Sequence, residues 1–196
     1  MRAILTDWRT DLIKAHPKLF HAPAGVPQAA RGYPACGDGW RELLNSACAK
    51  IDTAISEGES FTVLQIKEKW ATLRFFWRGS LSTEAEAKIV EAVTLAEARS
   101  ACTCSQCGEE GRLYRAGGLL ITRCSLHAKG QPVELTAGLE NVHIVRRIVA
   151  GQFRGVTCSR YIRATDMFID LLPDPPGIEV RGEISSSRCR GAADGW

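Results

Sequence analysis

Apolar residues recur at helical spacing in three stretches of the first hundred residues. The first predicted helix covers about residues 2–16. A second covers about residues 38–56, with Asp38 as its expected N-cap. A third begins at a capping box formed by Thr83 and Glu86. The residues expected to face the core are Leu5, Trp8, Leu12, Ile13, Trp40, Leu43, Leu44, Ala47, Ile51, Ile55, Ile89, Val93 and Ala96.

β-Branched and aromatic residues mark the predicted strands. They crowd residues 61–67 and 72–78, which predicts a β-hairpin with Leu73, Phe75 and Trp77 on one face. A second hairpin is predicted from a strand over 142–149 to a strand over about 153–158. The stretch 165–173 is interpreted as a short helix, because a proline ends it.

Four potential metal ligands form two short pairs. Cys104-x2-Cys107 and Cys124-x2-His127 are separated by sixteen residues. Zinc prefers four nitrogen and sulfur ligands in a tetrahedron, so these residues predict one structural zinc ion with no position open for water or substrate. The alternative is four reduced side chains packed together without a metal.

The residues between the two pairs predict how the pairs meet. Short apolar runs flank Gly117-Gly118 and predict a hairpin, and residues 125–127 are expected to begin a short helix. This arrangement resembles a treble-clef zinc finger, a scaffold with many unrelated binding functions. Cys102 is close enough in sequence to replace Cys104 as a ligand. The remaining cysteines, to which no role is assigned, are Cys36, Cys48, Cys158 and Cys189.

These elements predict an α+β fold, a small antiparallel sheet packed by helices with an embedded treble-clef-like zinc module. The chain of 196 residues, 45% of them apolar, has the length and composition of a globular domain with an appended module. We divide it into a helical and β-hairpin core (1–101), the zinc module (102–130), a C-terminal hairpin and short helix (131–176) and a flexible tail (177–196), which is poor in large apolar residues.

The apolar runs are too short for export or for crossing a membrane. The N-terminal run is shorter than a signal sequence needs, and there is no stretch of 18 or more apolar residues. We therefore expect a soluble, cytoplasmic protein with no membrane partner, whose eight cysteines are kept as thiols by the reducing compartment.

Two stretches are basic, although the net charge of the whole chain is only +3. The first hairpin carries Lys67, Lys69, Trp70 and Arg74, a combination that suits single-stranded nucleic acid. The alternative is that its aromatic residues face the core and its cations face solvent.

The second basic stretch contains five arginines and no acidic residue between positions 143 and 163. Such a patch suits an acidic protein surface or nucleic acid. The alternative is a set of ion pairs with Glu84, Glu86, Glu91 and Glu97 of the third helix. The arginines are Arg146, Arg147, Arg154, Arg160 and Arg163.

An enzymatic function has little support in the sequence. Asn141 and His143 follow the zinc module, as the catalytic residues of some metal-dependent nucleases do, but the paired ligands that should precede them are missing. No nucleophile triad, phosphate loop or carboxylate pair is evident, so no catalytic residue is assigned. Binding of a protein ranks first, binding of nucleic acid second, and a metal-dependent nuclease third.

Three motifs follow one another in residues 37–129: Gly39-Trp40, the hairpin QIKEKWATLRFFW, and CSQCG followed by CSLHA. In this order they resemble a family of uncharacterised bacteriophage and prophage proteins. Trp70-Ala71 departs from the aromatic-glycine pair of that family. The resemblance implies a phage accessory protein of the bacterial cytoplasm with no assigned reaction. A phage protein with a zinc-stabilised core, a basic strand pair and a polar tail is expected to bind and inhibit a host or defence-system complex, as anti-CRISPR proteins do.

Overall fold

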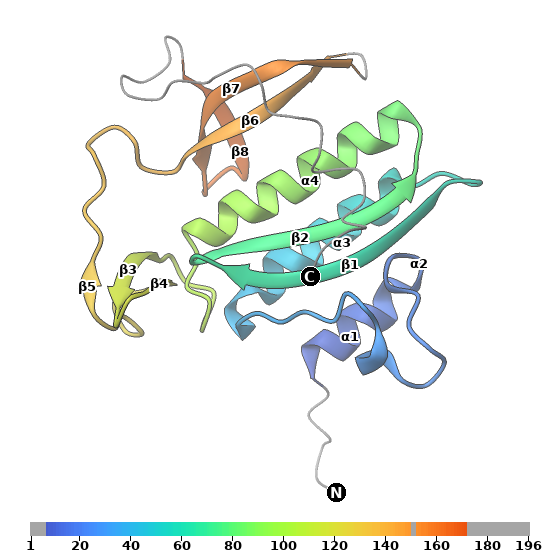
Figure 1. Ribbon diagram of the computed structural model, residues 1–196, viewed down its shortest axis with the longest axis horizontal. Coiled ribbons are helices and arrows are strands. Elements are labelled where there is room, and N and C mark those ends of the chain that lie inside the picture. Colours follow the sequence, from blue (N-terminus) through green and yellow to red (C-terminus); the bar gives the residue numbers. More distant parts are fainter. Residues whose placement is uncertain (1–6, 150–151, 172–196) are drawn as a thin grey trace, which may run out of the picture.

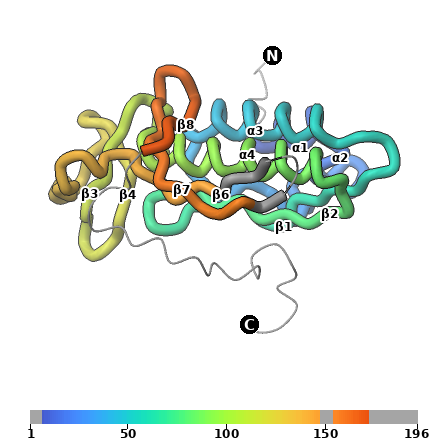
Figure 2. Tube along the Cα trace, turned by 90° about the horizontal axis from the view of Figure 1, so that it is seen from above, coloured from blue at the N-terminus to red at the C-terminus, as the bar shows by residue number. Residues whose placement is uncertain are grey.

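The computed structural model describes residues 7–149 and 152–171 and has an α+β fold. Three small antiparallel sheets are present in this part of the chain. The first is the hairpin of β1 (Ser60–Lys69) and β2 (Thr72–Ser80), and helices α3 (Arg41–Ala54) and α4 (Thr83–Ala101) pack behind it (Figures 1 and 2). The predicted hairpin and the last two predicted helices are thereby confirmed.

The main core lies between this hairpin and the helices. Helices α1 (Trp8–Ala15) and α2 (Pro17–Phe20) and the 3-10 turns η1 (Pro27–Ala29) and η2 (Asp38–Trp40) close its remaining side. Burial of large apolar side chains is the main stabilising contribution in such a core. Its fully buried side chains include Leu12, Ile13, Leu19, Phe20, Trp40, Leu44, Ile51, Val63, Ile66, Leu73 and Ile89.

Helix α4 also covers the free edge of β2. The Ser100 hydroxyl accepts a hydrogen bond from the backbone N–H of Leu73 at 2.8 Å, and the Glu97 carboxylate accepts one from Phe75 at 3.3 Å. Unpaired strand N–H groups template pairing with other chains, so side-chain acceptors on α4 take the place of a third strand.

The second sheet has the order β6-β7-β8 and packs against another part of α4. Its strands are β6 (Val142–Val149), β7 (Gln152–Ile162) and β8 (Met167–Asp170). Tyr161 is buried there with Leu95, Ala98 and Cys102. The Tyr161 hydroxyl donates to Asp166, which also pairs with Lys50 at 3.1 Å and Arg99 at 3.5 Å. The second predicted hairpin is confirmed: β6 has the predicted bounds, and β7 extends further than the expected 153–158.

The third sheet, in the order β4-β3-β5, lies at one end of the molecule (Figure 1). It consists of β3 (Arg112–Ala116), β4 (Leu119–Arg123) and the short β5 (Gln131–Pro132). The hairpin predicted around Gly117-Gly118 is confirmed. The two glycines have positive φ, as a tight turn between paired strands requires.

Three local predictions about helices are wrong. Residues 165–171, the described part of the predicted helix 165–173, do not form a helix, because Met167–Asp170 pairs with Ser159–Ile162 as an edge strand. Asp38 does not cap α3, since it accepts hydrogen bonds from Trp8 and Arg9 instead. Ser82 rather than Thr83 caps α4, because its side chain accepts a hydrogen bond from the backbone N–H of Ala85.

Three predicted features lie outside the described residues. They are the tail 177–196, Cys189 and the first residues of the N-terminal helix.

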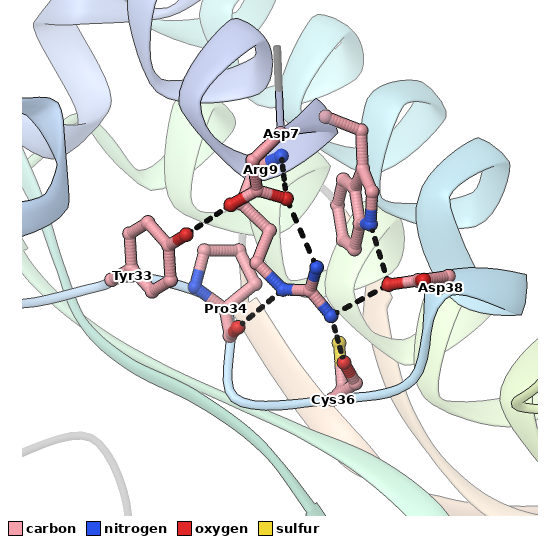
Figure 3. A network of polar contacts seen from close by, with 7 residues as sticks. Asp7, Arg9, Tyr33, Pro34, Cys36 and Asp38 are labelled. Atoms are coloured by element: carbon pink, nitrogen blue, oxygen red, sulfur yellow. Dashed lines mark hydrogen bonds and ion pairs between the residues drawn. The ribbon is translucent and has the colours of Figure 1, made fainter. Parts of the chain in front are cut away.

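Arg9 ties α1 to the segment that leads into α3 (Figure 3). Its guanidinium donates to the carbonyls of Pro34 at 3.0 Å and Cys36 at 2.5 Å. It also pairs with Asp7 at 3.1 Å and with Asp38 at 2.8 Å. Hydrogen bonds from the Trp8 indole and from Arg9 hold the pKa of Asp38 below its ordinary value.

We predict that Arg9→Lys lowers the free energy of unfolding by about 2–4 kcal/mol, because an ammonium group cannot reproduce the planar fork that serves two carbonyls and two carboxylates. Chemical denaturation monitored by circular dichroism measures the change. Arg31→Lys, at an exposed position, is the matched control and should alter stability by less than about 0.5 kcal/mol. Equal stability of the two variants would contradict this role of Arg9.

Candidate metal centre

The four predicted ligands meet in one cluster. The ligand atoms of Cys104, Cys107, Cys124 and His127 all lie within 4.8 Å of one another. The Cys107 and Cys124 sulfurs are 3.6 Å apart, and His127 Nδ1 lies 3.7 Å from the Cys104 sulfur and 3.3 Å from that of Cys124. A tetrahedral zinc ion with Zn–S bonds of about 2.3 Å sets its sulfur ligands roughly 3.8 Å apart. The side chains therefore fit zinc, with His127 binding through Nδ1.

The backbone builds each half of the cluster as a turn. Gly108 N–H donates to the carbonyl of Cys104 at 2.9 Å, and its φ of 86° is one that glycine adopts without strain. In the second pair, His127 N–H donates to the carbonyl of Cys124 at 3.1 Å. Residues 125–127 form this turn and not the predicted helix, so the helix expected of a treble clef does not begin there.

The backbone around Cys104 favours a thiolate. Burial by itself raises the pKa of this thiol, but hydrogen bonds from the backbone N–H groups of Cys124, Gln106 and Cys107 lower it to about 6. Thiolates are the form in which cysteine binds zinc. The donor set of three sulfurs and one nitrogen is that of closed structural sites, and the zinc it can hold would link the ends of the β3–β4 hairpin.

Cys102 does not take part in the cluster. Its side chain is 4% exposed within the core beside Tyr161, and its thiol donates to the carbonyl of Arg99 at 3.3 Å. Burial raises the pKa of Cys102 and, more strongly, raises that of Cys36 to about 12. Cys48 and Cys158 are fully buried, so these thiols serve as small apolar side chains.

The cluster packs against the segment that leads into α3, a contact that the sequence analysis did not predict. The Trp40 indole donates to the carbonyl of Thr103 at 3.1 Å, and Gly39 N–H donates to the carbonyl of Ser105 at 3.1 Å. A Cβ atom at Gly37 or Gly39 would overlap the backbone of the first ligand turn. The Gly39-Trp40 pair was the only sequence signal of this contact.

Two more contacts attach the ligand turns to the other sheets. The Thr122 hydroxyl donates to the carbonyl of Ala71 in the β1–β2 turn at 2.9 Å. Arg163, which follows β7, donates to the carbonyl of Gly108 at 3.1 Å. The metal cluster thus lies where α3, the first hairpin and the β6-β7-β8 sheet meet.

The five predicted binding arginines have different environments. Arg160 donates to the carbonyl of Gly138 at 2.7 Å, and Arg163 donates to the carbonyl of Gly108. Arg154 is exposed, Arg146 is half-buried, and the side chain of Arg147 lies outside the described part. Two of the acidic partners considered for them pair elsewhere, Glu84 with Lys88 and Glu97 with Arg74.

The predicted binding residues of the first hairpin share one surface. Lys67 and Arg74 are register partners on the face turned away from the core, with Lys69 next to them. Trp70 stands at the turn and is 71% exposed.

His143, the one histidine considered for catalysis, is half-buried and packs edge-on against Phe168 at 6.0 Å. Burial lowers its pKa.

Comparisons with protein families, curated proteins and solved structures find no match for this chain. The resemblance to phage proteins therefore rests on the motifs alone. Among the helices of residues 7–149 and 152–171, none is long and apolar enough to cross a membrane.

We predict one tightly bound zinc ion per chain, measured by elemental analysis of protein purified without chelator. Cys107→Ser should abolish this stoichiometry and lower the melting temperature by at least about 10 °C, because the free energy of binding at such a site contributes to folding. Cys102→Ser is the control: its hydroxyl can donate to the same carbonyls, so zinc content should stay unchanged. A stoichiometry near zero in the wild-type protein would contradict the prediction.

Proposed function

We propose that the chain is a zinc-stabilised protein that binds and inhibits a protein complex in the bacterial cytoplasm, and that it is not an enzyme. The motif resemblance to phage and prophage proteins adds a role in counter-defence, in the manner of anti-CRISPR proteins. The observation that carries the proposal is the outer face of the β6-β7-β8 sheet.

This outer face carries several exposed apolar side chains. Ile144 is 51% exposed, Met167 59% and Ile169 57%. Residues directly opposite in antiparallel strands point to the same side, and the register sets Ile169 beside Arg160 and Ile162 beside Met167. Neighbouring large apolar residues at more than half exposure are the feature by which docking surfaces differ from ordinary surface.

The charges on this face fit an acidic protein partner. Arg160 lies across the sheet from Val142, and Arg146 across from Val156, so arginines alternate with apolar residues along the same face. Arginine and large apolar residues are enriched in the centres of protein interfaces, where guanidinium groups bind carboxylates in a bidentate way. The half-buried position of His143 on the opposite face, against Phe168, agrees with a binding rather than a catalytic role.

A second candidate function, the binding of nucleic acid, is favoured by a different surface. The outer face of the β1–β2 hairpin is basic and carries exposed aromatic side chains.

The proposal is tested by replacing two exposed residues of the sheet, Ile144→Asp together with Ile169→Asp. Tagged wild-type protein captures its partner from a bacterial lysate, with and without nuclease treatment, and binding is then reproduced with the purified partner. We expect the double variant to bind at least tenfold more weakly, because it sets carboxylates against an acidic surface. Unfolding free energy should change little, since both side chains are exposed.

Leu119→Asp is the matched control. Leu119 is 70% exposed on the β3–β4 hairpin, so the same charge is introduced away from the sheet, and partner binding should stay at the wild-type level. A double variant that binds the purified partner as tightly as the wild type would overturn the assignment. Loss of the partner on nuclease treatment would do the same.

A further inference from the structure

We infer that the outer face of the β1–β2 hairpin is a binding site for single-stranded nucleic acid. The site is separate from the protein-binding surface on β6-β7-β8, and it would exist even if the proposed function were wrong.

The strand register gathers cations on this face. Lys67 pairs with Arg74, Lys69 with Thr72, and Thr62 with Arg78. Because residues alternate between faces along a strand, the buried residues Ile66, Leu73 and Phe75 face the core while these side chains face outward. The outward residues of the described hairpin include Thr62, Gln65, Lys67, Lys69, Thr72, Arg74, Phe76 and Arg78, with no carboxylate among them.

Among the described residues outside the hairpin, Glu97 is an acidic group that reaches this face. Glu97 of α4 lies 3.8 Å from the Arg74 guanidinium, and its other oxygen accepts from the Phe75 backbone. That pair is at the margin of the face next to α4, so Lys67, Lys69 and Arg78 supply most of the uncompensated charge. A row of cations along an open strand pair matches the regular charge of a phosphate backbone.

Aromatic rings stand among the cations. Phe76 is 45% exposed although it lies within a strand, and the Lys67 ammonium is 5.6 Å from its ring centre. Trp70 is 71% exposed with the Lys69 ammonium at 4.8 Å. Exposed rings on a basic sheet face stack with bases, while neighbouring ammonium groups contact phosphates. A duplex offers no unstacked bases to such rings, which favours a single strand.

The turn that carries Trp70 is held in a costly conformation. Trp70 has φ of 53° and Ala71 has φ of 64°, the left-handed region that a two-residue hairpin turn requires and that glycine or asparagine usually supplies. Ala71 is fully buried, and its carbonyl accepts from Thr122 of the zinc hairpin. The metal module therefore fixes the backbone while the indole projects into solvent, which reduces the entropy lost on stacking.

The experiment measures fluorescence anisotropy of labelled 15-nucleotide oligo(dT) and oligo(U) with the zinc-loaded full chain at several salt concentrations. We expect a Kd at or below about 1 μM near 0.1 M salt, tighter than the non-specific range, with log K falling linearly against log salt. Lys67→Glu with Lys69→Glu should reduce that slope by about 1.4, the value for two phosphate contacts on a single strand.

The stacking contribution of the Trp70 ring is tested separately from the contribution of the charged side chains. Trp70→Ala should weaken binding at least fivefold with little change in the salt slope, whereas Trp70→Phe keeps a ring and should retain most of the affinity. Lys14→Glu with Lys18→Glu, on α1 and α2, is the control for net charge and should leave the salt slope near wild type.

Three outcomes would overturn the site. They are a Kd weaker than about 1 μM for both oligonucleotides, equal effects of the two lysine pairs, and equal affinity for a duplex of the same length. If the hairpin variants instead lose the protein partner and leave oligonucleotide binding unchanged, the face belongs to the protein interface. Variants at Ile144 and Ile169 test the proposed function independently, so failure of one inference is distinguishable from failure of the other.

Discussion

The fold depends on the close contact between the first ligand turn of the zinc cluster and the backbone that leads into α3. Gly37 and Gly39 allow this approach, because a side chain at either position would overlap the turn. Trp40 then fills the core and donates its indole N–H to the same turn. Contacts from Thr122 to Ala71 and from Arg163 to Gly108 attach the other two sheets to it. Contacts to one short ligand turn and the strand beside it thus determine the position of elements far apart in the sequence.

The two proposed binding surfaces follow from the position of α4. This helix packs against β2 through one part of its surface and against β6 and β7 through another. Both sheets use their inner faces for these contacts and present their outer faces to solvent. A partner that combines protein and single-stranded nucleic acid is therefore the class of complex that could contact both surfaces of one molecule.

Local features were predictable from the sequence, and features set by distant residues were not. The hairpin over 61–67 and 72–78 and the four ligands follow from alternation and spacing within short windows. The strand Met167–Asp170 was mistaken for a helix because a short apolar run does not distinguish the two, and its pairing with β7 decides. Asp38 has the properties of an N-cap, but Trp8 and Arg9, about thirty residues earlier, bind it instead.

The hydrogen-bond acceptors that α4 provides to β2 protect the protein against aggregation at high concentration. A two-stranded ribbon ordinarily exposes edge amides to which the strand of another molecule can add, and this is a common first step of aggregation. Here Ser100 and Glu97 occupy two of those amides without adding a strand, so the ribbon stays two strands wide. Loss of either side chain would leave an amide of β2 open to a neighbouring molecule, so these two residues protect solubility through hydrogen bonds to the backbone.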